Sequence, residues 1–591
     1  MIFKNIMMEQ YYTNERNVQI LVSLLKQHGI KRIIVSPGST NVTFVGSVQQ
    51  DSYFELYSCI DERSAAYMAC GMAAETCEPV ALSCTGATAA RNYFSALTEA
   101  YYRKLPVLAI TSSQDISRIS HLIPQVTDRS RQPLDTVKMS VLLQNVKDAD
   151  DEWDCMIKAN KAILELRHRD MGPVHINLCT TYSPDFNVRE LPIARKIDRI
   201  CLEDTFPEIK SGKVAIYVGS HKRWSQTEIE YVDQFCATYN AVVFVDPTSN
   251  YTGKYRVNFS LVSGQQDSSP NNSPDLLIHI GDMSDMLGVI CRPKEVWRVS
   301  EDGELCDPYR SLSCVFEMSE KAFFQHYINK ESKGDNSYYN SCIKEYESLM
   351  GNLPDLPFSH LWIASQIHDR FPASSTIHLG ILSPLRSWSF FEIDKSIEVY
   401  CNQGGFGIDG NMSSMIGASM VSSDKLFYGI VGDLSFFYDM NCLGNRHIGN
   451  NIRILLVNNS LGAEFMLFKQ RNSIYVNDGQ DFISAGGHNG CQSPSLVKGL
   501  SESLGFEYMS ASSKEEFSSV SERFLCPEMT DRPMIFEIFV NPENENDALY
   551  QLKHIRTSVK KTAKTLVKNI LHGNGAQTHP EKYQISKNHF K

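Results

Sequence analysis

Residues 425–439 read KLFYGIVGDLSFFYD, and residues 452–459 read IRILLVNN. Each stretch begins as an apolar run of strand length and ends in polar residues, and the segment between them is long enough to hold a helix. A crossover helix joins parallel strands, and the carboxyl ends of such strands meet at one edge of the sheet, where ligands bind. The sequence therefore predicts that Asp433 and Asn459 lie close together at a ligand-binding edge.

The residue types at these strand ends suit a diphosphate held by a divalent cation. The carboxylate of Asp433 and the amide oxygen of Asn459 are hard oxygen ligands of the kind that magnesium prefers. Gly432 carries no side chain, so the backbone at this position can approach a diphosphate closely. The pattern thus predicts a shared site for magnesium and a diphosphate.

Strand-like runs alternate with helical patterns along most of the chain. One example is EPVALSCTG (residues 78–86), which we expect to form a strand and a turn before a helix at residues 92–102. This alternation predicts α/β domains, each with a parallel sheet flanked by helices. Polar stretches at about residues 185–212 and at residues 332–342 mark the boundaries. We expect three domains at residues 1–190, 191–355 and 356–548, followed by a basic C-terminal tail at residues 549–591.

Composition and charge narrow the class of protein. The chain has 591 residues and a formal net charge of −11, which argues against nucleic acid or an anionic membrane as its main partner. Its 16 cysteines show no zinc-site spacing and suit a reducing cytoplasm. No run approaches the ~18 apolar residues of a membrane span, and the first residues become polar too early for a signal peptide. We therefore expect a soluble cytoplasmic protein.

A second segment, DERSAAYMACGMA (residues 61–73), places Glu62 directly after a predicted strand, at the start of a helix expected over residues 61–76. Spaced alanines and Gly71 give this helix a face that permits close packing. A carboxyl group in a dry site shares a proton strongly with a bound ligand. Because a lone glutamate in the first turn of a helix is usually a surface charge, the role of Glu62 depends on the motifs around it.

A third segment, NQGGFGIDGNMSSMIGAS (residues 402–419), holds four glycines in a loop whose backbone can lie against a ligand. Such a loop is weak evidence when taken alone. Together with SPGS (residues 36–39), VGDLSFFYD (residues 431–439) and GPVHINL (residues 172–178), it resembles one family. That family is the SEPHCHC synthases, thiamine-diphosphate (ThDP) enzymes that join isochorismate to 2-oxoglutarate in menaquinone biosynthesis. The resemblance runs from about residue 15 to about residue 545.

This resemblance implies ThDP and Mg²⁺ as cofactors. By it, Glu62 hydrogen-bonds N1′ of the cofactor's aminopyrimidine and so favours the form that removes the proton from thiazolium C2. Asp433, Asn459 and the carbonyl of Leu461 would hold Mg²⁺, and Gln125 would face the substrate as part of the catalytic set.

The resemblance also implies an architecture. The first domain would bind the pyrimidine and the third the diphosphate, around a central Rossmann-like domain. Ile408 would support a bent cofactor, and Phe465 would form an apolar wall. Because Glu62 of one subunit would serve a cofactor bound mainly by another, we expect a homodimer or homotetramer. The other positions that would bind the cofactor are Ser36, Pro37, Gly38, Gly404, Gly405, Gly407, Gly432, Leu434 and Ser435.

The chain departs from this family where the family binds substrate carboxylates. The family has an arginine directly after SPGS, where this chain has Thr40, and another after the asparagine that opens the glycine loop, where Gln403 stands. Loss of two fork-shaped cations should weaken carboxylate recognition. We therefore expect the family's cofactor chemistry with an acceptor other than isochorismate.

Other side chains could take over the recognition of substrate. Arg91 and Arg386 are candidate carboxylate anchors, with a structural ion pair as the alternative for each, and Gln403 is a candidate substrate contact. The family's glutamine beyond the NN pair is Ala463 here. The neighbouring Glu464 is a candidate for proton transfer, as is His121.

These observations predict an enzyme that decarboxylates a 2-oxo acid donor and joins the remaining fragment to a second small molecule. Two alternatives stay open. One is a simple 2-oxo acid decarboxylase or an acetolactate-synthase-like enzyme, and the other is a non-catalytic protein that binds ligand through a ThDP fold. The central domain has VGSHKR (residues 218–223) in place of a GxGxxG fingerprint, which disfavours a dinucleotide, although some relatives hold a flavin there by other contacts.

Overall fold

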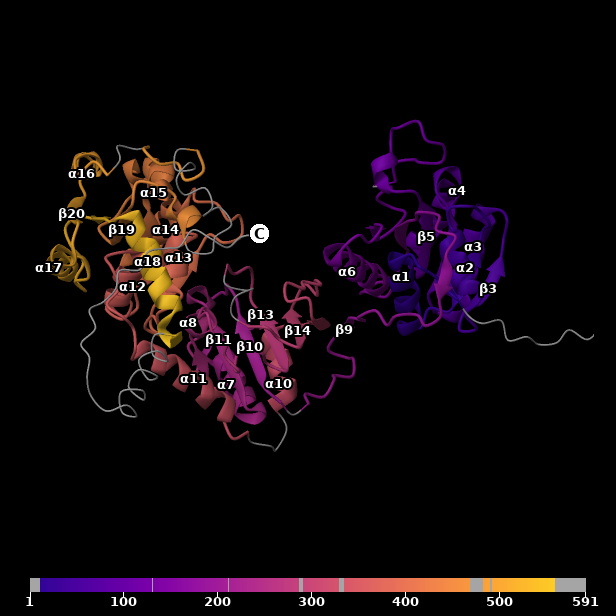
Figure 1. Cartoon of the computed structure of the whole chain (residues 1–591), viewed down its shortest axis with the longest axis horizontal. Helices are drawn as coiled ribbons and strands as arrows, with labels where there is room; N and C mark the ends of the chain where they lie inside the picture. The colour runs from indigo at the N-terminus through magenta and orange to yellow at the C-terminus, as the bar shows by residue number, and fades with distance from the viewer. Residues whose placement is uncertain are drawn as a thin grey trace, which may run out of the picture. The chain divides into compact units, whose positions relative to one another are not determined.

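The computed structural model describes residues 11–129, 131–210, 212–285, 291–328, 334–467, 482–488 and 492–557 (Figure 1). Parallel sheets flanked by helices run through it, which confirms the predicted fold class. The chain divides into two compact units. The first comprises Met1–Lys210, Leu276–His279 and Pro293–His326, and the second comprises Ser211–Asp275, Ile280–Arg292 and Tyr327–Lys591.

A six-stranded parallel sheet forms the centre of the first unit, with strand order β3-β2-β4-β5-β7-β6. Successive strand residues face opposite sides, so one set packs with α1, α2 and α6 and the other with α3, α4 and α5 (Figure 1). The strands are β2 (Arg32–Val35), β3 (Glu55–Ser58), β4 (Val80–Thr85), β5 (Val107–Ser113), β6 (Met139–Leu143) and β7 (Val174–Cys179). The helices are α1 (Arg16–Gln27), α2 (Val42–Gln49), α3 (Glu62–Thr76), α4 (Ala87–Asn92), α5 (Phe94–Arg103) and α6 (Ala149–Glu165).

A second six-stranded parallel sheet lies in the second unit, with strand order β17-β16-β18-β19-β21-β20. Its core includes apolar residues of β18, β19 and α14. The strands are β16 (Thr376–Leu379), β17 (Glu398–Cys401), β18 (Phe427–Gly432), β19 (Ile452–Asn458), β20 (Glu507–Ala511) and β21 (Met534–Phe539). The helices are α12 (His360–Ile367), α13 (Ser383–Trp388), α14 (Asn411–Met420), α15 (Asp433–Asp439), α16 (Leu496–Ser503), α17 (Lys514–Phe524) and α18 (Pro542–Lys553).

Both six-stranded sheets reverse their strand order beside their first strand, between β2 and β4 in the first sheet and between β16 and β18 in the second. Each sheet reverses once more at its other end, where β7 precedes β6 and β21 precedes β20. Open α/β sheets bind ligands in the crevice at the carboxyl ends of the strands beside such a reversal. The loops after β2, β4, β16 and β18 are therefore the first places to look for a site.

The middle of the chain adds further parallel strands. The second unit contains β10 (Val214–Val218), β11 (Ala241–Val245) and β12 (Arg256–Val257), paired in the order β12-β11-β10. The first unit contains all of β13 (Leu276–Ile280) except its last residue, with β14 (Glu295–Ser300), β15 (Leu312–Glu317) and β9 (Asp198–Ile200), paired in the order β13-β14-β15-β9. The helices of this region are α7 (Gln226–Tyr239), α8 (Ser260–Ser263), α10 (Glu320–Ile328) and α11 (Ser337–Met350), and a short pair joins β1 (Tyr12–Thr13) to β8 (Phe186–Val188).

The helix expected at residues 92–102 begins earlier than predicted and is divided in two. α4 starts at Ala87, directly after Gly86, and α5 follows Tyr93. Alanines at 87, 89 and 90 favour helix strongly, so the residues between the expected turn and the expected helix are helical too. The three proposed domain ranges stay a prediction, and the basic tail beyond residue 557 lies outside the described residues. Within the described part of the chain, no helix combines the length and apolar character that crossing a bilayer requires.

Candidate active site

Asp433 lies at the reversal between β16 and β18 in the second sheet. β18 ends at Gly432, and Asp433 opens α15, where its side chain is buried. Burial raises the pKa of the Asp433 carboxyl to about 7, against the effect of hydrogen bonds from the backbone of Asp433, Leu434 and Ser460. A buried carboxyl with so little compensation for its charge is suited to a bound cation.

Asn459 follows the neighbouring strand at the same edge. β18 and β19 pair in parallel, with Gly432 opposite Val457, so the loops after both strands leave the sheet side by side. Asn459 and Leu461 are buried, and the Leu461 N–H donates to Asn459 Oδ1 at 3.3 Å. Ser460 has a φ of 65°, which turns the chain sharply between them. The structure thus brings together the residues predicted to hold magnesium.

The glycine loop is tied to α15 by side-chain hydrogen bonds. Ser435 Oγ donates to the Ile408 carbonyl at 2.6 Å, and Asn411 Nδ2 donates to the same carbonyl and to Ser435 Oγ, both at 3.0 Å. A Cβ added to Gly404, Gly405 or Gly432 would meet nothing within 4 Å. The backbone at these glycines therefore borders open space, as a loop that receives a diphosphate requires.

The SPGS segment lies at the reversal between β2 and β4 in the first sheet. It follows β2, and the Ser36 N–H donates to the Ser83 carbonyl of β4 at 2.9 Å. A Cβ on Gly38 would stand 2.0 Å from Thr85 Cγ2, so only glycine fits there. Thr40 is buried, and its hydroxyl donates to the Ser112 carbonyl at 2.7 Å.

Glu62 opens α3 directly after β3 and the N-cap residue Asp61, as predicted. It is half-buried, and Asn92 Nδ2 donates to its Oε2 at 2.9 Å. Asn92 is the last residue of α4, whereas the sequence analysis expected it to open the helix at residues 92–102. The hydrogen bond restrains the carboxyl group of Glu62. Gln125 and His121 lie exposed in the segment between residues 119 and 138.

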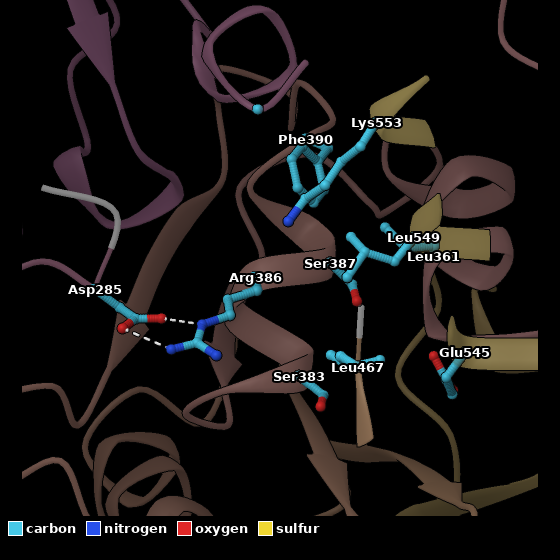
Figure 2. Close-up of a pocket in the computed structure, with 11 residues that line it drawn as sticks. Asp285, Leu361, Ser383, Arg386, Ser387, Phe390, Leu467, Glu545, Leu549 and Lys553 are labelled. Atoms are coloured by element: carbon cyan, nitrogen blue, oxygen red, sulfur yellow. Dashed lines mark hydrogen bonds and ion pairs between the residues drawn. The ribbon is translucent and has the colours of Figure 1, made fainter. Parts of the chain in front are cut away.

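Arg386 of α13 pairs with two acidic side chains, Asp285 and Glu464. Figure 2 shows the pairing with Asp285. Arg386 Nη2 donates to Asp285 Oδ1 at 3.0 Å, its Nε donates to Asp285 Oδ2, and its Nη1 donates to Glu464 Oε1. The carboxylates of Asp285 and Glu464 are both buried. The cluster borders a cavity of about 200 Å³ that Phe390 and Lys553 also line. Arg386 is thus a structural ion-pair partner, and its use as a substrate anchor stays a prediction.

Gln403 is occupied by neighbouring protein groups. It is buried, its Oε1 accepts from the Asp285 N–H at 2.8 Å, and its Nε2 donates to Thr248 Oγ1 at 3.0 Å. Phe465 and Glu464 belong to a short 3-10 helix, Ala463–Met466, that follows the Asn459 loop. Phe465 is partly exposed, whereas Glu464 is buried. Both polar atoms of the Gln403 side chain already bond to protein groups, and a contact between Gln403 and substrate stays a prediction.

Comparison with known proteins decides the family. Residues 16–138 match the family described as "Thiamine pyrophosphate enzyme, N-terminal TPP binding domain". The 2-succinyl-5-enolpyruvyl-6-hydroxy-3-cyclohexene-1-carboxylate (SEPHCHC) synthase of Phocaeicola vulgatus is 31% identical over 92% of this chain and 99% of its own length. The synthase of Bacteroides fragilis strain ATCC 25285 is 30% identical over 92% of this chain and its full length. The chain belongs to the SEPHCHC synthase family.

Membership of this family makes the chain a thiamine-diphosphate-dependent enzyme that acts on a 2-oxo acid. A solved structure, the thiamine diphosphate-dependent 4-hydroxybenzoylformate decarboxylase of Rhodococcus jostii RHA1, has a TM-score of 0.38 and 15% identity over 89% of this chain and 99% of that one.

The sequence analysis missed three side chains that shape these regions. Asn92 restrains Glu62, and Asp285 pairs with Arg386. Arg129 lines a cavity in the first unit together with the predicted anchor Arg91. The contacts of Asn92 and Asp285 join residues about 30 and 100 positions apart, so no local pattern marks them.

Proposed function

We propose that this protein is a ThDP- and Mg²⁺-dependent carboligase. It would decarboxylate a 2-oxo acid and join the remaining fragment to an acceptor other than isochorismate. The observation that carries the proposal is the buried carboxyl of Asp433 beside Asn459, at the edge where the second sheet reverses its strand order.

The residues around this edge fit a diphosphate and its metal. Asp433, Asn459 and the Leu461 carbonyl would hold Mg²⁺, and the open space at Gly404, Gly405 and Gly432 would receive the diphosphate. Ser435 and Asn411 hold the Ile408 carbonyl in place, and the Ile408 side chain would support the cofactor.

Glu62 would act on the aminopyrimidine. The Asn92 hydrogen bond to one carboxyl oxygen restrains the group, so that its other oxygen can exchange a proton with a ring nitrogen. When bound, ThDP supplies an electron sink for the electron pair that remains after carbon dioxide leaves. The chain's own contribution is to position the reactants and to hold the proton on Glu62.

The proposal of a different acceptor rests on three occupied positions. Thr40 and Gln403, which replace the family's arginines, are buried and hydrogen-bonded to protein groups. Arg386 has two carboxylates against its guanidinium. A di- or tricarboxylate would find no cation in these places that is available for bidentate binding. The proposal also includes a homo-oligomer, since the family's Glu62 position serves a cofactor bound mainly by another subunit.

Calorimetric titration of metal-stripped protein with ThDP, with and without Mg²⁺, tests the cofactor site. The wild type should bind tightly only with Mg²⁺, and Asp433→Ala should lose that dependence, whereas Asp424→Ala, an exposed acid just before β18, should not. Absence of binding to the wild type at every Mg²⁺ concentration would favour the non-catalytic alternative.

Product analysis then separates the two enzymatic alternatives. A panel of 2-oxo acids should release carbon dioxide, and Glu62→Gln should lower this rate about 10²- to 10⁴-fold, the usual contribution of a general acid–base group. Incubation of active donors with neutral aldehydes and hydroxylated ketones should give coupled products. An aldehyde as the sole product with every acceptor would sink the carboligase proposal and leave a decarboxylase.

A further inference from the structure

The first unit contains a cavity of about 310 Å³ that none of the predicted cofactor residues lines. Residues of β5, β7 and α5 line it, together with residues 128–129 and 131–133. Three arginines, Arg91, Arg129 and Arg131, line it, together with the apolar side chains of Phe94 and Leu97. Cavities that hold small molecules have about this size and this mixture of apolar walls and a few polar groups.

Arg129 is the deepest of the three cations. Its side chain is only 6% exposed, and Nη2 donates to Asn177 Oδ1. Its Nε and Nη1 are buried and have no hydrogen-bond partner among the residues that the structure describes. The titratable groups that act on the pKa of Arg129 are the thiols of Cys84 and Cys179 and the guanidinium of Arg91. Burial raises the pKa of both thiols, so neither provides a counter-charge at neutral pH.

A buried guanidinium in such surroundings is costly. Burial lowers the pKa of Arg129 to about 10, so the side chain still carries its charge at neutral pH. A buried charge without a counter-charge is strongly unfavourable, and proteins retain one where a ligand provides the opposite charge. The two buried nitrogens of Arg129 for which the described residues provide no hydrogen-bond partner are therefore suited to an anionic ligand.

Other groups in the cavity fit this assignment. His175 is neutral at physiological pH, because burial lowers the pKa of its imidazole to about 3. It therefore does not offer a second cation to the anion. Both of its ring nitrogens are also engaged, by Thr111 Oγ1 and Ser140 Oγ at 2.7 Å each. Arg91 and Arg131 are exposed at the mouth, where Asp128 is also exposed. The mouth of the cavity thus carries both positive and negative side chains, whereas the one cation among the described residues of its buried part is Arg129.

We propose that this cavity binds a small organic anion, with its carboxylate or phosphate on Arg129, its entry assisted by Arg91 and Arg131, and its short apolar part against Phe94 and Leu97. The proposal needs no ThDP chemistry and goes beyond the proposed function. It gives Arg91 the carboxylate-binding role predicted from sequence, as an outer group rather than the anchor.

Calorimetry on the full chain loaded with ThDP and Mg²⁺ tests the site. The probes are succinate, butyrate and inorganic phosphate, each compared with chloride at equal ionic strength. The wild type should bind at least one probe, and Arg129→Gln should weaken that binding at least tenfold, as loss of a charge-assisted anchor does. Preference for butyrate or succinate over phosphate identifies a carboxylate ligand, and the reverse order identifies a phosphate ligand.

Two controls keep the result interpretable. Arg103→Gln changes an exposed arginine of α5 that pairs with Glu99, and it should bind the probes as the wild type does. Arg131→Gln should weaken binding only slightly, since its cation lies at the mouth. Failure of all three probes to bind the wild type at tens of millimolar, or equal binding by Arg129→Gln, overturns the proposal. Because binding is measured directly, neither outcome depends on whether the protein proves to be a carboligase.

Discussion

The side chains of Arg386 and Arg129 are both mostly buried, but within the described part of the chain only Arg386 has negatively charged partners. Arg386, in the second unit, lies between the carboxylates of Asp285 and Glu464. Arg129, in the first unit, has one amide partner and two unused nitrogens. The comparison teaches that burial alone does not make an arginine a ligand anchor, because the charge must also be left without a carboxylate partner. By that criterion Arg129 suits the proposed anion site better than Arg386 does.

The largest expected effect is a loss of stability when Arg386, the arginine with two carboxylate partners, is removed. Arg386→Met leaves two buried carboxylates without a counter-charge, so we expect a loss of about 3 kcal/mol in the free energy of unfolding at pH 7. Urea unfolding at pH 7 measures this loss.

The control for that experiment is a surface pair of the same chemistry. Arg523 donates to both carboxylate oxygens of Glu507, at 2.9 and 2.7 Å, on the exposed side of α17. Arg523→Met should cost less than about 1 kcal/mol. Equal losses for the two variants would show that the Arg386 cluster has no special role in stability.

The next largest effect tests whether Arg386 can be released. Asp285→Asn removes one negative charge but keeps the backbone N–H that donates a hydrogen bond to Gln403 Oε1. Arg386 should then attract carboxylates, and the KM for a dicarboxylic 2-oxo acid should fall about tenfold relative to that for pyruvate, as one charge-assisted hydrogen bond would give. Steady-state carbon dioxide release measures this ratio, with Asp424→Asn as control. An unchanged ratio would mean that substrate does not approach Arg386.

Removal of Arg129, which has no carboxylate partner among the residues that the structure describes, should have a smaller effect and should stabilise the protein. Arg129→Met removes a buried charge that lacks a counter-charge, so without added anion the protein should be more stable by about 1 kcal/mol. The wild type should overtake the variant when the bound anion is supplied. Thermal unfolding with and without succinate measures both quantities. Destabilisation of the anion-free variant would indicate that Arg129 has a structural counter-charge after all.

The smallest effect concerns the backbone beside Arg129. A Cβ added at Gly86 would stand 3.1 Å from Arg129 Nη1 and 3.2 Å from the Ser112 carbonyl. Gly86→Ala should shift the guanidinium slightly and weaken anion binding about threefold. Gly71→Ala is the matched control, because its added Cβ meets nothing within 4 Å. Calorimetry with succinate compares the two, and an effect of the same size in both would remove the steric explanation.

The parts of the site that follow strands were the parts that could be predicted from sequence. Asp433 and Asn459 lie where parallel pairing of β18 and β19 requires, and Glu62 opens the helix expected after β3. The neutralisation of Arg386 could not be predicted, because Asp285 lies 101 positions away in the chain. Arg129 stands in the polar run DRSR, which is typical of a solvated loop, and only the packing of that loop against β5 and β7 buries it.

Gln403 constrains how this enzyme could have diverged from its relatives. Its side chain joins the backbone of Asp285 to the hydroxyl of Thr248, at the position where the family has an arginine. Reversion by Gln403→Arg alone would leave the buried Asp285 N–H without its acceptor and add a second guanidinium beside an already balanced cluster. A substitution at this position therefore has to be accompanied by changes at its two partners if their polar groups are to stay hydrogen-bonded.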